Sequence, residues 1–272
     1  MIPEAAASPA DETGRPLVSI ICAVKDCEGY IERLVKNIDS QIFPSKELLI
    51  IDGASKDKTK DILKSLGHMI DYQVSEPDTG IYDAMDKGIE KARGKWLYFM
   101  GADDIFFSSS TLNSIFCAEP LPKQVWLLFG NVVDDRGKIF ESCFNKKLWL
   151  KNTLHHQGTF YHREVFKNFR YNIPFDEKEN SSGFRISGDY RLNLKLFFEK
   201  VPYHKINGII AICGKGVSKQ GRWIGYKEEI IIRHQFMGTF FATPFDILTL
   251  LRFVFKRFLQ VCGQYAAPLG LK

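Results

Sequence analysis

The sequence lacks the short motifs that mark several common nucleotide-binding and metal-binding classes. None of its 272 residues forms a G-x-G-x-x-G or a G-x-x-x-x-G-K-[ST] loop, which argues against a dinucleotide-binding dehydrogenase and a P-loop enzyme. Its six cysteines include no C-x-x-C pair, so neither a zinc site nor a disulfide framework is indicated, and a reducing compartment is favoured. No internal repeat is present.

The two ends of the chain have unusual compositions. Residues 1–15 lack the basic and apolar stretches of a secretory signal peptide, so they are expected to form a disordered tail. Residues 201–272 hold only three acids against ten Lys and Arg, a net +7, which leaves −2 for the rest of a chain whose total is +5. This basic third favours an anionic partner, either a membrane surface or a polyphosphate, and no nucleic-acid partner is predicted.

Apolar runs alternate with helical stripes over the first hundred residues. The predicted strands are 17–24, 46–51, 71–75 and 96–100. Helical spacing of apolar residues lies between them, most clearly at 30–42 and 81–92. The alternation predicts βαβ units and therefore a mostly parallel, Rossmann-like central sheet flanked by helices. Beyond residue 104 the pattern weakens, and we expect helices at 111–117 and 191–199 and strands at 125–134 and 139–143.

Carboxylates follow three of the predicted strands. Asp26 and Asp52 come after the first and second strands, and Asp103 and Asp104 come after the fourth. A single Asp at such a position is as often a turn or cap residue as a functional one. However, ligands of open α/β sheets bind at the carboxyl edge, where these acids would meet. Mg²⁺ and Mn²⁺ prefer carboxylate oxygens and commonly bridge to substrate phosphates, so the pattern indicates a metal–diphosphate site.

Four sequence blocks stand out over residues 17–104. They are V-S-I-I-C-A-V-K-D, L-L-I-I-D-G-A-S-K-D-K-T, E-P-D-T-G-I-Y-D-A-M-D-K-G and Y-F-M-G-A-D-D. In order and spacing they resemble family 2 glycosyltransferases with a GT-A fold, and the long third block is similar to bacterial enzymes of the capsule, O-antigen and colanic-acid type. The resemblance implies one GT-A domain over 16–235, with a nucleotide-binding half at 16–104 and an acceptor half at 105–235.

The resemblance also implies roles for individual residues. The nucleotide pocket would be lined by Ala23, Val24 and Asp26, the base or ribose bound by Asp52, and the donor flanked by Asp83 and Asp86. Asp103 would ligate Mn²⁺ or Mg²⁺, with Asp104 and donor phosphates completing the shell, and Asp189 would be the catalytic base. Three positions depart from the family pattern: Gly101 replaces the first acid of D-x-D, Ala23-Val24-Lys25-Asp26 replaces Pro-Thr-Tyr-Asn, and Asp86 replaces Asn.

Several candidate residues in the second half leave alternatives open. One carboxylate opposite a leaving diphosphate gives direct displacement with inversion, which suits Asp189. The same residue could cap a helix at 190–199, either alone or together with the catalytic role. Asp176 and Glu177 are competing acids. His155 and His156 could contact the acceptor or ligate metal, although adjacent histidine side chains diverge in most conformations.

Residues 236–272 are predicted to form a helical segment associated with a membrane. On a helical wheel, apolar side chains surround one polar sector made of Asp246, Arg252, Lys256, Arg257 and Gln260. The Lys and Arg content argues against a membrane-spanning helix and favours a basic amphipathic helix in the membrane interface. The alternative is a helix packed on the catalytic domain.

Together, the residues and the resemblance predict an inverting, metal-dependent glycosyltransferase. It would move a sugar from a nucleotide donor, UDP-linked, to a hydroxyl of a lipid-linked glycan in bacterial surface polysaccharide biosynthesis. The predicted location is cytoplasmic, peripheral on the inner face of the plasma membrane. Two other functions stay open: a sugar nucleotidyltransferase, which would need a Gly-rich basic loop after the first strand, and a non-catalytic GT-A module that binds nucleotide sugar or glycan.

Overall fold

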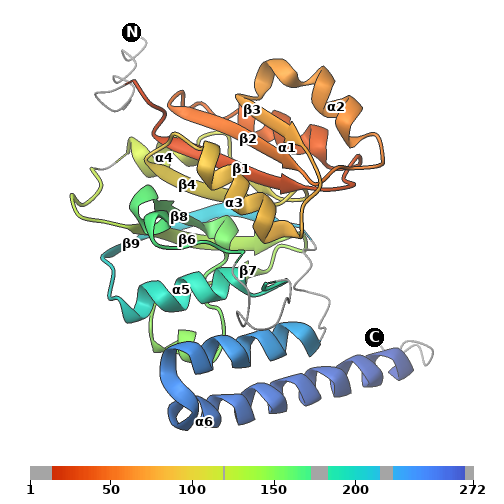
Figure 1. Cartoon of the computed structure of the whole chain (residues 1–272), viewed down its shortest axis with the longest axis vertical. Coiled ribbons are helices and arrows are strands. Elements are labelled where there is room, and N and C mark those ends of the chain that lie inside the picture. Colours follow the sequence, from red (N-terminus) through yellow and green to blue (C-terminus); the bar gives the residue numbers. More distant parts are fainter. Residues whose placement is uncertain (1–13, 119, 173–182, 215–222, 267–272) are drawn as a thin grey trace.

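The computed structural model describes residues 14–118, 120–172, 183–214 and 223–266. Most of the predicted tail (1–15), the competing acids Asp176 and Glu177, and residues 267–272 lie outside the described residues. Within them, a nine-stranded sheet has the order β3-β2-β1-β4-β8-β6-β9-β5, and β7 pairs with β6 (Figure 1).

The first half of the sheet is parallel, as the alternating pattern predicts. Its strands are β1 (Val18–Val24), β2 (Lys46–Asp52), β3 (Tyr72–Ser75) and β4 (Trp96–Met100). β1 pairs in parallel with both β2 and β4, and β2 pairs in parallel with β3. Because β1 and β4 are covered on both faces, they read as continuous apolar runs in the sequence. The predicted α/β class with a parallel core is confirmed for this half.

The second half of the sheet is mixed. Its strands are β5 (Ile105–Phe106), β6 (Leu127–Asp134), β7 (Ile139–Phe140), β8 (Thr159–His162) and β9 (Tyr203–Cys213). β8 pairs antiparallel with β4 and with β6, whereas β6 and β9 are parallel. The sequence pattern weakens here because β5, β7 and β8 are short, the register between β6 and β9 shifts, and β9 carries polar residues on an exposed side.

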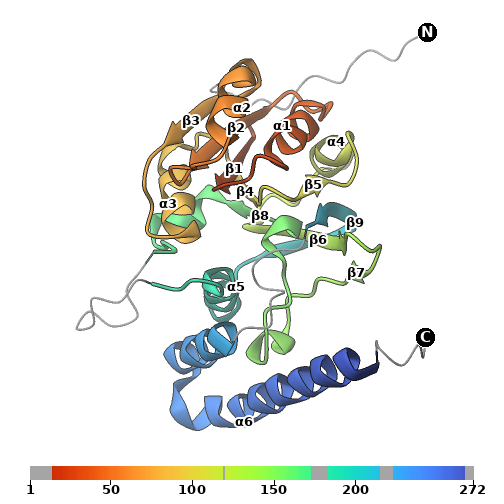
Figure 2. The ribbon, with the colours of Figure 1, turned by 90° about the vertical axis from the view of Figure 1, so that its right-hand side faces the viewer.

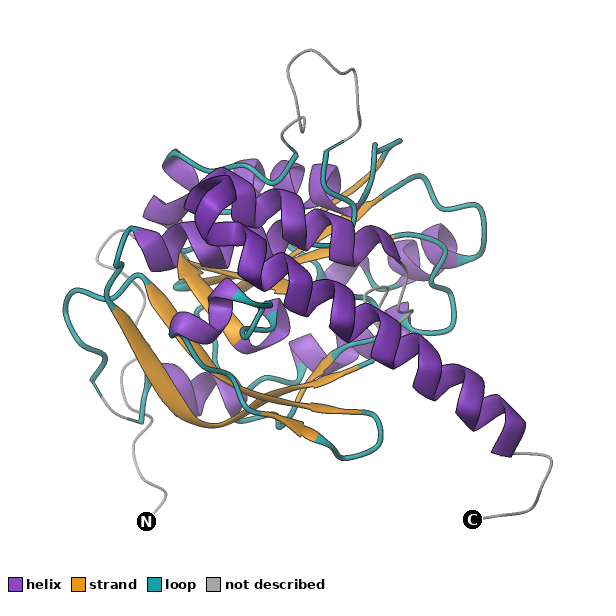
Figure 3. Ribbon diagram, turned by 90° about the horizontal axis from the view of Figure 1, so that it is seen from below, coloured by secondary structure: helices purple, strands orange, loops and turns teal. Residues whose placement is uncertain are grey.

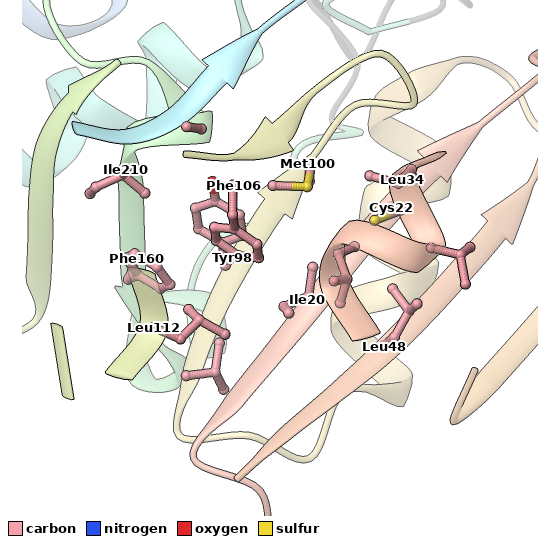
Figure 4. Close-up of a cluster of buried hydrophobic side chains, with 14 of the residues drawn as sticks. Ile20, Cys22, Leu34, Leu48, Tyr98, Met100, Phe106, Leu112, Phe160 and Ile210 are labelled. Carbon is pink, nitrogen blue, oxygen red and sulfur yellow. The ribbon is translucent and has the colours of Figure 1, made fainter. Parts of the chain in front are cut away.

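Helices cover both faces of the sheet and create two apolar cores. On one face lie α1 (Ile31–Asp39), α2 (Thr59–Ser65) and α4 (Thr111–Phe116), and on the other lie α3 (Ile81–Lys91) and α5 (Gly188–Phe198). Short 3-10 helices connect the elements: η1 (Gly67–Met69), η2 (Lys146–Trp149), η3 (His156–Gly158) and η4 (Arg163–Lys167). Figure 4 shows the first core, in which Leu34 of α1 faces Ile20 and Cys22 of β1.

The C-terminal helix α6 (Trp223–Ala266) is two helices joined at a kink. Gly238 has φ 69° and ψ 161°, which is not helical, and Pro244 follows it. The first part, 223–237, packs beside α5. The second part, 239–266, runs back beneath the first part (Figures 1 and 3). We call the second part the return helix. The predicted boundary at 235/236 thus lies within α6, a few residues before the kink.

The return helix presents its apolar side to solvent. Its exposed large side chains are Phe240, Phe241, Ile247, Leu248, Leu250, Leu251, Val254, Phe255, Phe258 and Leu259. Asp246 and Arg252, from the predicted polar sector, contact the first part of α6 instead. By length and composition alone, residues 223–259 could cross a membrane, and only 11% of their most apolar window is buried. The edge-on view in Figure 2 shows this helix at one end of the molecule, away from the sheet.

Candidate functional site

A cavity of about 790 Å³ opens at the carboxyl ends of β1 and β4. That volume lies within the range of small-molecule sites, roughly 300–1,000 Å³. Its wall combines the end of β1, the turn after β4, the start of α3, the segment 152–157, the start of α5 and α6. Among the predicted site residues, those lining it are Ala23, Val24, Asp103, Asp104, His155, His156 and Asp189. The cavity therefore lies at the carboxyl edge of the sheet, where the strand-end acids predicted a ligand site.

The two acids after β4 have different surroundings. Asp104 is buried, and its carboxylate accepts hydrogen bonds from the backbone N–H groups of Gly101 and Gly214, each 2.9 Å away. The amide of Gln157 donates a third, also at 2.9 Å. Burial raises the pKa of Asp104, while the bonds from Gln157 and Gly214 act in the opposite direction. Asp104 is thus held by the protein, whereas the Asp103 side chain lines the cavity beside it.

Glycines on both sides of Asp103 make room for this arrangement. A Cβ added at Gly101 would lie 2.8 Å from an Asp104 oxygen, and one at Gly214 would collide with the Asp103 carboxylate. An acid at position 101, as in the D-x-D signature, would therefore crowd the buried Asp104. This gives a physical reason for the departure at Gly101.

Asp189 lies in the first turn of α5 and faces the cavity. Its Oδ2 accepts a hydrogen bond from the Asn152 amide at 2.8 Å, and its Oδ1 accepts one from the Tyr190 N–H at 2.8 Å. The alternative that Asp189 caps this helix is wrong, because Ser187 occupies the N-cap position. A carboxylate in a first helical turn is favoured by the helix dipole.

The segment before Asp189 is held from two directions. Glu228 of α6 is buried and accepts hydrogen bonds from the backbone N–H groups of three consecutive residues, Arg185, Ile186 and Ser187, at 2.7–3.0 Å. From α3, the Tyr82 hydroxyl donates to the Ile186 carbonyl at 2.7 Å and accepts from the Gly188 N–H at 2.8 Å. The start of α5 is therefore tied both to α6 and to the third sequence block.

The adjacent histidines diverge, as expected for neighbouring side chains. The His155 ring meets Phe140 edge-on at 4.5 Å between ring centroids, and its Nδ1 lies 3.3 Å from the Gln157 side-chain oxygen. The His156 Nδ1 lies 3.7 Å from Asp189 Oδ2. His156 is thus the histidine beside the candidate base.

Four of the predicted donor residues, Asp26, Asp52, Asp83 and Asp86, are not among the cavity-lining residues, and the first two lie just after the end of β1 and at the end of β2. Asp52 is buried and accepts hydrogen bonds from the hydroxyls of Ser55 and Ser75. Asp26 has φ 46°, in the left-handed region, and accepts a hydrogen bond from the Lys56 N–H at 2.7 Å. Asp26 thus fastens the loop after β1 to the loop after β2, and Asp52 fastens the end of β2 to its following loop and to the end of β3.

The two predicted acids of α3 also contact protein groups. Asp83 accepts a hydrogen bond from the Thr79 N–H at 3.0 Å and lies 3.5 Å from the Lys87 ammonium. Asp86 accepts hydrogen bonds from the N–H groups of Tyr171 and Asn172 at 3.0 and 2.8 Å. Burial raises the pKa of Asp86, against the effect of those two N–H groups.

The cavity wall includes residues that the sequence reasoning did not single out. Asp78 lies within the third block, so the block itself carried a signal for it. Asn152 and Gln157 flank the two histidines, but no spacing rule marks them. From α6, Arg252 and Lys256 reach the same cavity. Residues from distant parts of the chain therefore meet here, and the sequence indicated the strand-end acids, the two histidines and Asp189 but not these further residues.

A divalent metal fits one end of the cavity. Within the described ranges, no group of three or more His, Cys, Asp or Glu side chains could hold a metal ion by itself. Mg²⁺, however, is commonly bound by one or two carboxylates together with substrate phosphates. Asp103 supplies one carboxylate at the cavity wall, which is what such a shared site requires.

Comparison with known proteins gives the family and the fold. Residues 19–115 match the family model "Glycosyl transferase family 2". A PGL/p-HBAD biosynthesis glycosyltransferase of Mycobacterium tuberculosis is 30% identical over 192 residues, 67% of this chain and 70% of the relative. Among solved structures, S. aureus TarS 1–349 in complex with UDP-GlcNAc has a TM-score of 0.59 at 16% identity, covering 87% of this chain and 80% of that one. The Pyrobaculum calidifontis mannosyltransferase PcManGT, in complex with GDP-Man and Mn²⁺, has a TM-score of 0.57 at 16% identity, covering 95% and 81%.

Proposed function

This chain belongs to glycosyl transferase family 2, with a GT-A fold, and on that premise we propose that it transfers a sugar from a nucleotide-sugar donor to a hydroxyl of a glycan, with inversion. The observation that carries the proposal is a single cavity lined by both Asp103, at a strand end, and Asp189, in a first helical turn. The names of the relatives, which concern PGL/p-HBAD biosynthesis in one case and a UDP-GlcNAc complex in another, support a UDP-sugar and a bacterial surface glycan.

The donor end of the cavity is assigned to Asp103, Ala23 and Val24. Asp103 would hold Mn²⁺ or Mg²⁺, which when bound would neutralise the charge of the donor diphosphate. Asp104 supports the turn through its three N–H partners. Asp26, Asp52, Asp83 and Asp86 are proposed to shape the loops and helix that border the nucleotide.

The acceptor end is assigned to Asp189 as general base, with His155 and His156 beside the acceptor. The acceptor hydroxyl oxygen attacks the anomeric carbon, and its proton passes to the Asp189 carboxylate. The bond from that carbon to the diphosphate oxygen breaks, and the nucleoside diphosphate leaves with the electron pair. One displacement at one carbon inverts its configuration.

Replacing the base tests this mechanism. In Asp189→Asn the amide cannot take the proton, so we expect transfer to fall by about 10²–10⁴-fold, the usual contribution of general-base catalysis. Donor binding with Mn²⁺, measured by calorimetry, should stay at the wild-type level. Asp135→Asn, at an exposed position outside the cavity, is the matched control. Wild-type turnover in Asp189→Asn would contradict the assignment.

The same assays separate the other two functions. Donor binding without transfer to any acceptor, in the wild-type protein, would identify a non-catalytic binding module. Release of pyrophosphate from a sugar phosphate and a nucleoside triphosphate would identify a nucleotidyltransferase. The sequence after β1, Lys25-Asp26-Cys27-Glu28-Gly29, lacks the Gly-rich basic loop that the second of these reactions requires.

We also propose that the return helix binds the cytoplasmic face of the plasma membrane and that the acceptor is lipid-linked. Its outward side chains are 44–63% exposed, and Phe240 and Phe241 at the kink are 85% and 67% exposed. Lys256 and Arg257 on the same helix are exposed as well, which suits anionic headgroups. Arg252 and Lys256 also line the cavity, so the helix that would contact lipid borders the acceptor end.

Vesicle flotation tests the membrane proposal. A triple change, Leu251→Ser, Phe255→Ser and Phe258→Ser, should abolish flotation with anionic vesicles, since each buried side chain contributes about 1.5–3 kcal/mol. The control carries Phe107→Ser and Ile139→Ser, two side chains about half exposed on other parts of the surface. Unchanged flotation of the triple variant would contradict the proposal. Self-association of the wild-type protein without vesicles, lost in the triple variant, would assign this face to a second copy of the chain instead.

A further inference from the structure

A chain of buried hydrogen bonds leads from the interior to the candidate base. The Tyr161 hydroxyl donates to the Asn193 side-chain oxygen at 2.9 Å. The Asn193 amide donates to the Asn152 side-chain oxygen at 3.0 Å, and the Asn152 amide donates to Asp189 Oδ2 at 2.8 Å. Tyr161 and Asn193 are fully buried, whereas Asn152 lines the cavity. Every bond in this chain points towards Asp189.

The direction of the chain is fixed by its inner end. Burial strongly raises the pKa of Tyr161, so its hydroxyl keeps its proton and acts as a donor to Asn193. That bond orients the Asn193 amide, whose N–H also points to the Leu154 carbonyl at 3.5 Å. Asn193 in turn occupies the oxygen of Asn152, which leaves the Asn152 N–H groups for Asp189. Bonds aligned in this way polarise one another inside a protein.

We propose that Asn152 is a positioning residue for the base: anchored by Asn193 and Tyr161, it fixes the orientation of the Asp189 carboxylate and leaves it a free acceptor site towards the cavity. The proposal rests on the assignment of Asp189 as base under the proposed function. With one N–H on each Asp189 oxygen, from Asn152 and from Tyr190, lone pairs remain on both for the acceptor hydroxyl.

Three buried tyrosines surround Asp189. Tyr82, Tyr161 and Tyr171 are buried neighbours, and burial raises the pKa of each. His156 is the imidazole beside Asp189, with its Nδ1 3.7 Å from Asp189 Oδ2. A change in the pH dependence of transfer after substitution at Asn152 therefore reports on this pair.

The decisive variant is Asn152→Asp, which keeps the size of the side chain and places a second carboxylate at hydrogen-bond distance from Asp189. Two carboxylates that close do not both ionise easily. We expect kcat at pH 7 to fall by about 10- to 100-fold, in line with the loss from misplaced catalytic groups, and the acid limb of the pH–rate profile to move to higher pH. KM and Kd for the donor should stay at wild-type values.

Two further variants keep the test independent of folding. Asn152→Ala removes the bond without adding charge and should lower kcat by about 10-fold or more. Tyr161→Phe removes only the inner donor and should have a smaller effect of the same sign. Asn37→Asp is the matched control, because Asn37 bonds the Phe106 backbone and is outside both the chain and the cavity.

The outcomes separate this inference from the proposed function. Loss of transfer in Asp189→Asn, together with wild-type kcat and pH profile in the Asn152 variants, would overturn the role of Asn152 alone. Full transfer in Asp189→Asn would overturn the proposed function itself. Variants that lose activity only in proportion to their unfolded fraction, with an unshifted pH profile, would make Asn152 a purely structural residue and would also overturn the inference.

Discussion

Helix α1 and the return helix of α6 have opposite polarity. α1 buries Ile31, Leu34, Val35 and Ile38 against the sheet and exposes its charged residues. The return helix turns Asp246 and Arg252 towards the protein and exposes its Leu and Phe side chains. Exposed apolar patches mark interaction sites in other proteins, and we predict one on this side of the return helix. The comparison predicts where stability is lost on mutation and where it is not.

The largest loss is expected at Arg233. Its guanidinium is fully buried and donates to Asp246 at 3.0 Å, to Thr249 at 2.8 Å and to the Leu150 carbonyl at 3.0 Å. Arg233→Met leaves Asp246 without this partner, and we expect a loss of about 3–5 kcal/mol in the free energy of unfolding, measured in urea. Arg136→Met, at an exposed ion pair, should cost at most about 1 kcal/mol. Equal effects in the two variants would show that the return helix is not held by its polar side.

A leucine pair tests the apolar sides directly. Leu34→Ala creates a cavity in the core and should cost about 2–5 kcal/mol. Leu251→Ala, where the side chain is 60% exposed, should change the free energy of unfolding by no more than about 0.5 kcal/mol without lipid. A loss at Leu251 comparable to that at Leu34 would mean that its face is covered in solution.

The smallest of the three losses in the free energy of unfolding is expected at Arg252, and it should depend on pH. Burial raises the pKa of Glu229, and Arg252, 3.1 Å away, opposes that shift. Because a buried acid with a raised pKa binds a proton more readily when folded, its folded state loses stability as pH rises through that pKa. Arg252→Met removes the opposing charge, so we expect a loss of about 1–3 kcal/mol at pH 8 and a smaller one at pH 5. A loss of equal size at both pH values would exclude the ion pair as its cause.

The first hundred residues could be predicted because local pattern and burial agree there. β1 and β4 are buried on both faces, and α1 has its apolar residues on one side, so each element is visible within its own residues. The kink of α6 could not be predicted in the same way. A helical wheel shows which residues share a side but not which side meets the protein, and Asp246 and Arg252 find partners only through tertiary contacts.

The residues of the candidate site also differ in whether the sequence alone could identify them. Asp103 and Asp189 stand in recognisable blocks, and both line the cavity. Asn152, Asn193 and Tyr161 form their chain across three separate segments, and no spacing in the sequence brings them together. For Asp104 the sequence suggested a role that its contacts do not favour. Its position in the block resembles that of a metal ligand, yet its carboxylate oxygens accept hydrogen bonds from three N–H groups of the protein.

The hydroxyl of Tyr82 joins the helix beside the donor to the helix that carries the candidate base. A displacement of α3 on nucleotide binding would act through these two bonds on the turn that begins α5. We therefore predict that the two substrates are thermodynamically linked, so that a donor that changes acceptor affinity has its own affinity changed by the same factor when acceptor binds.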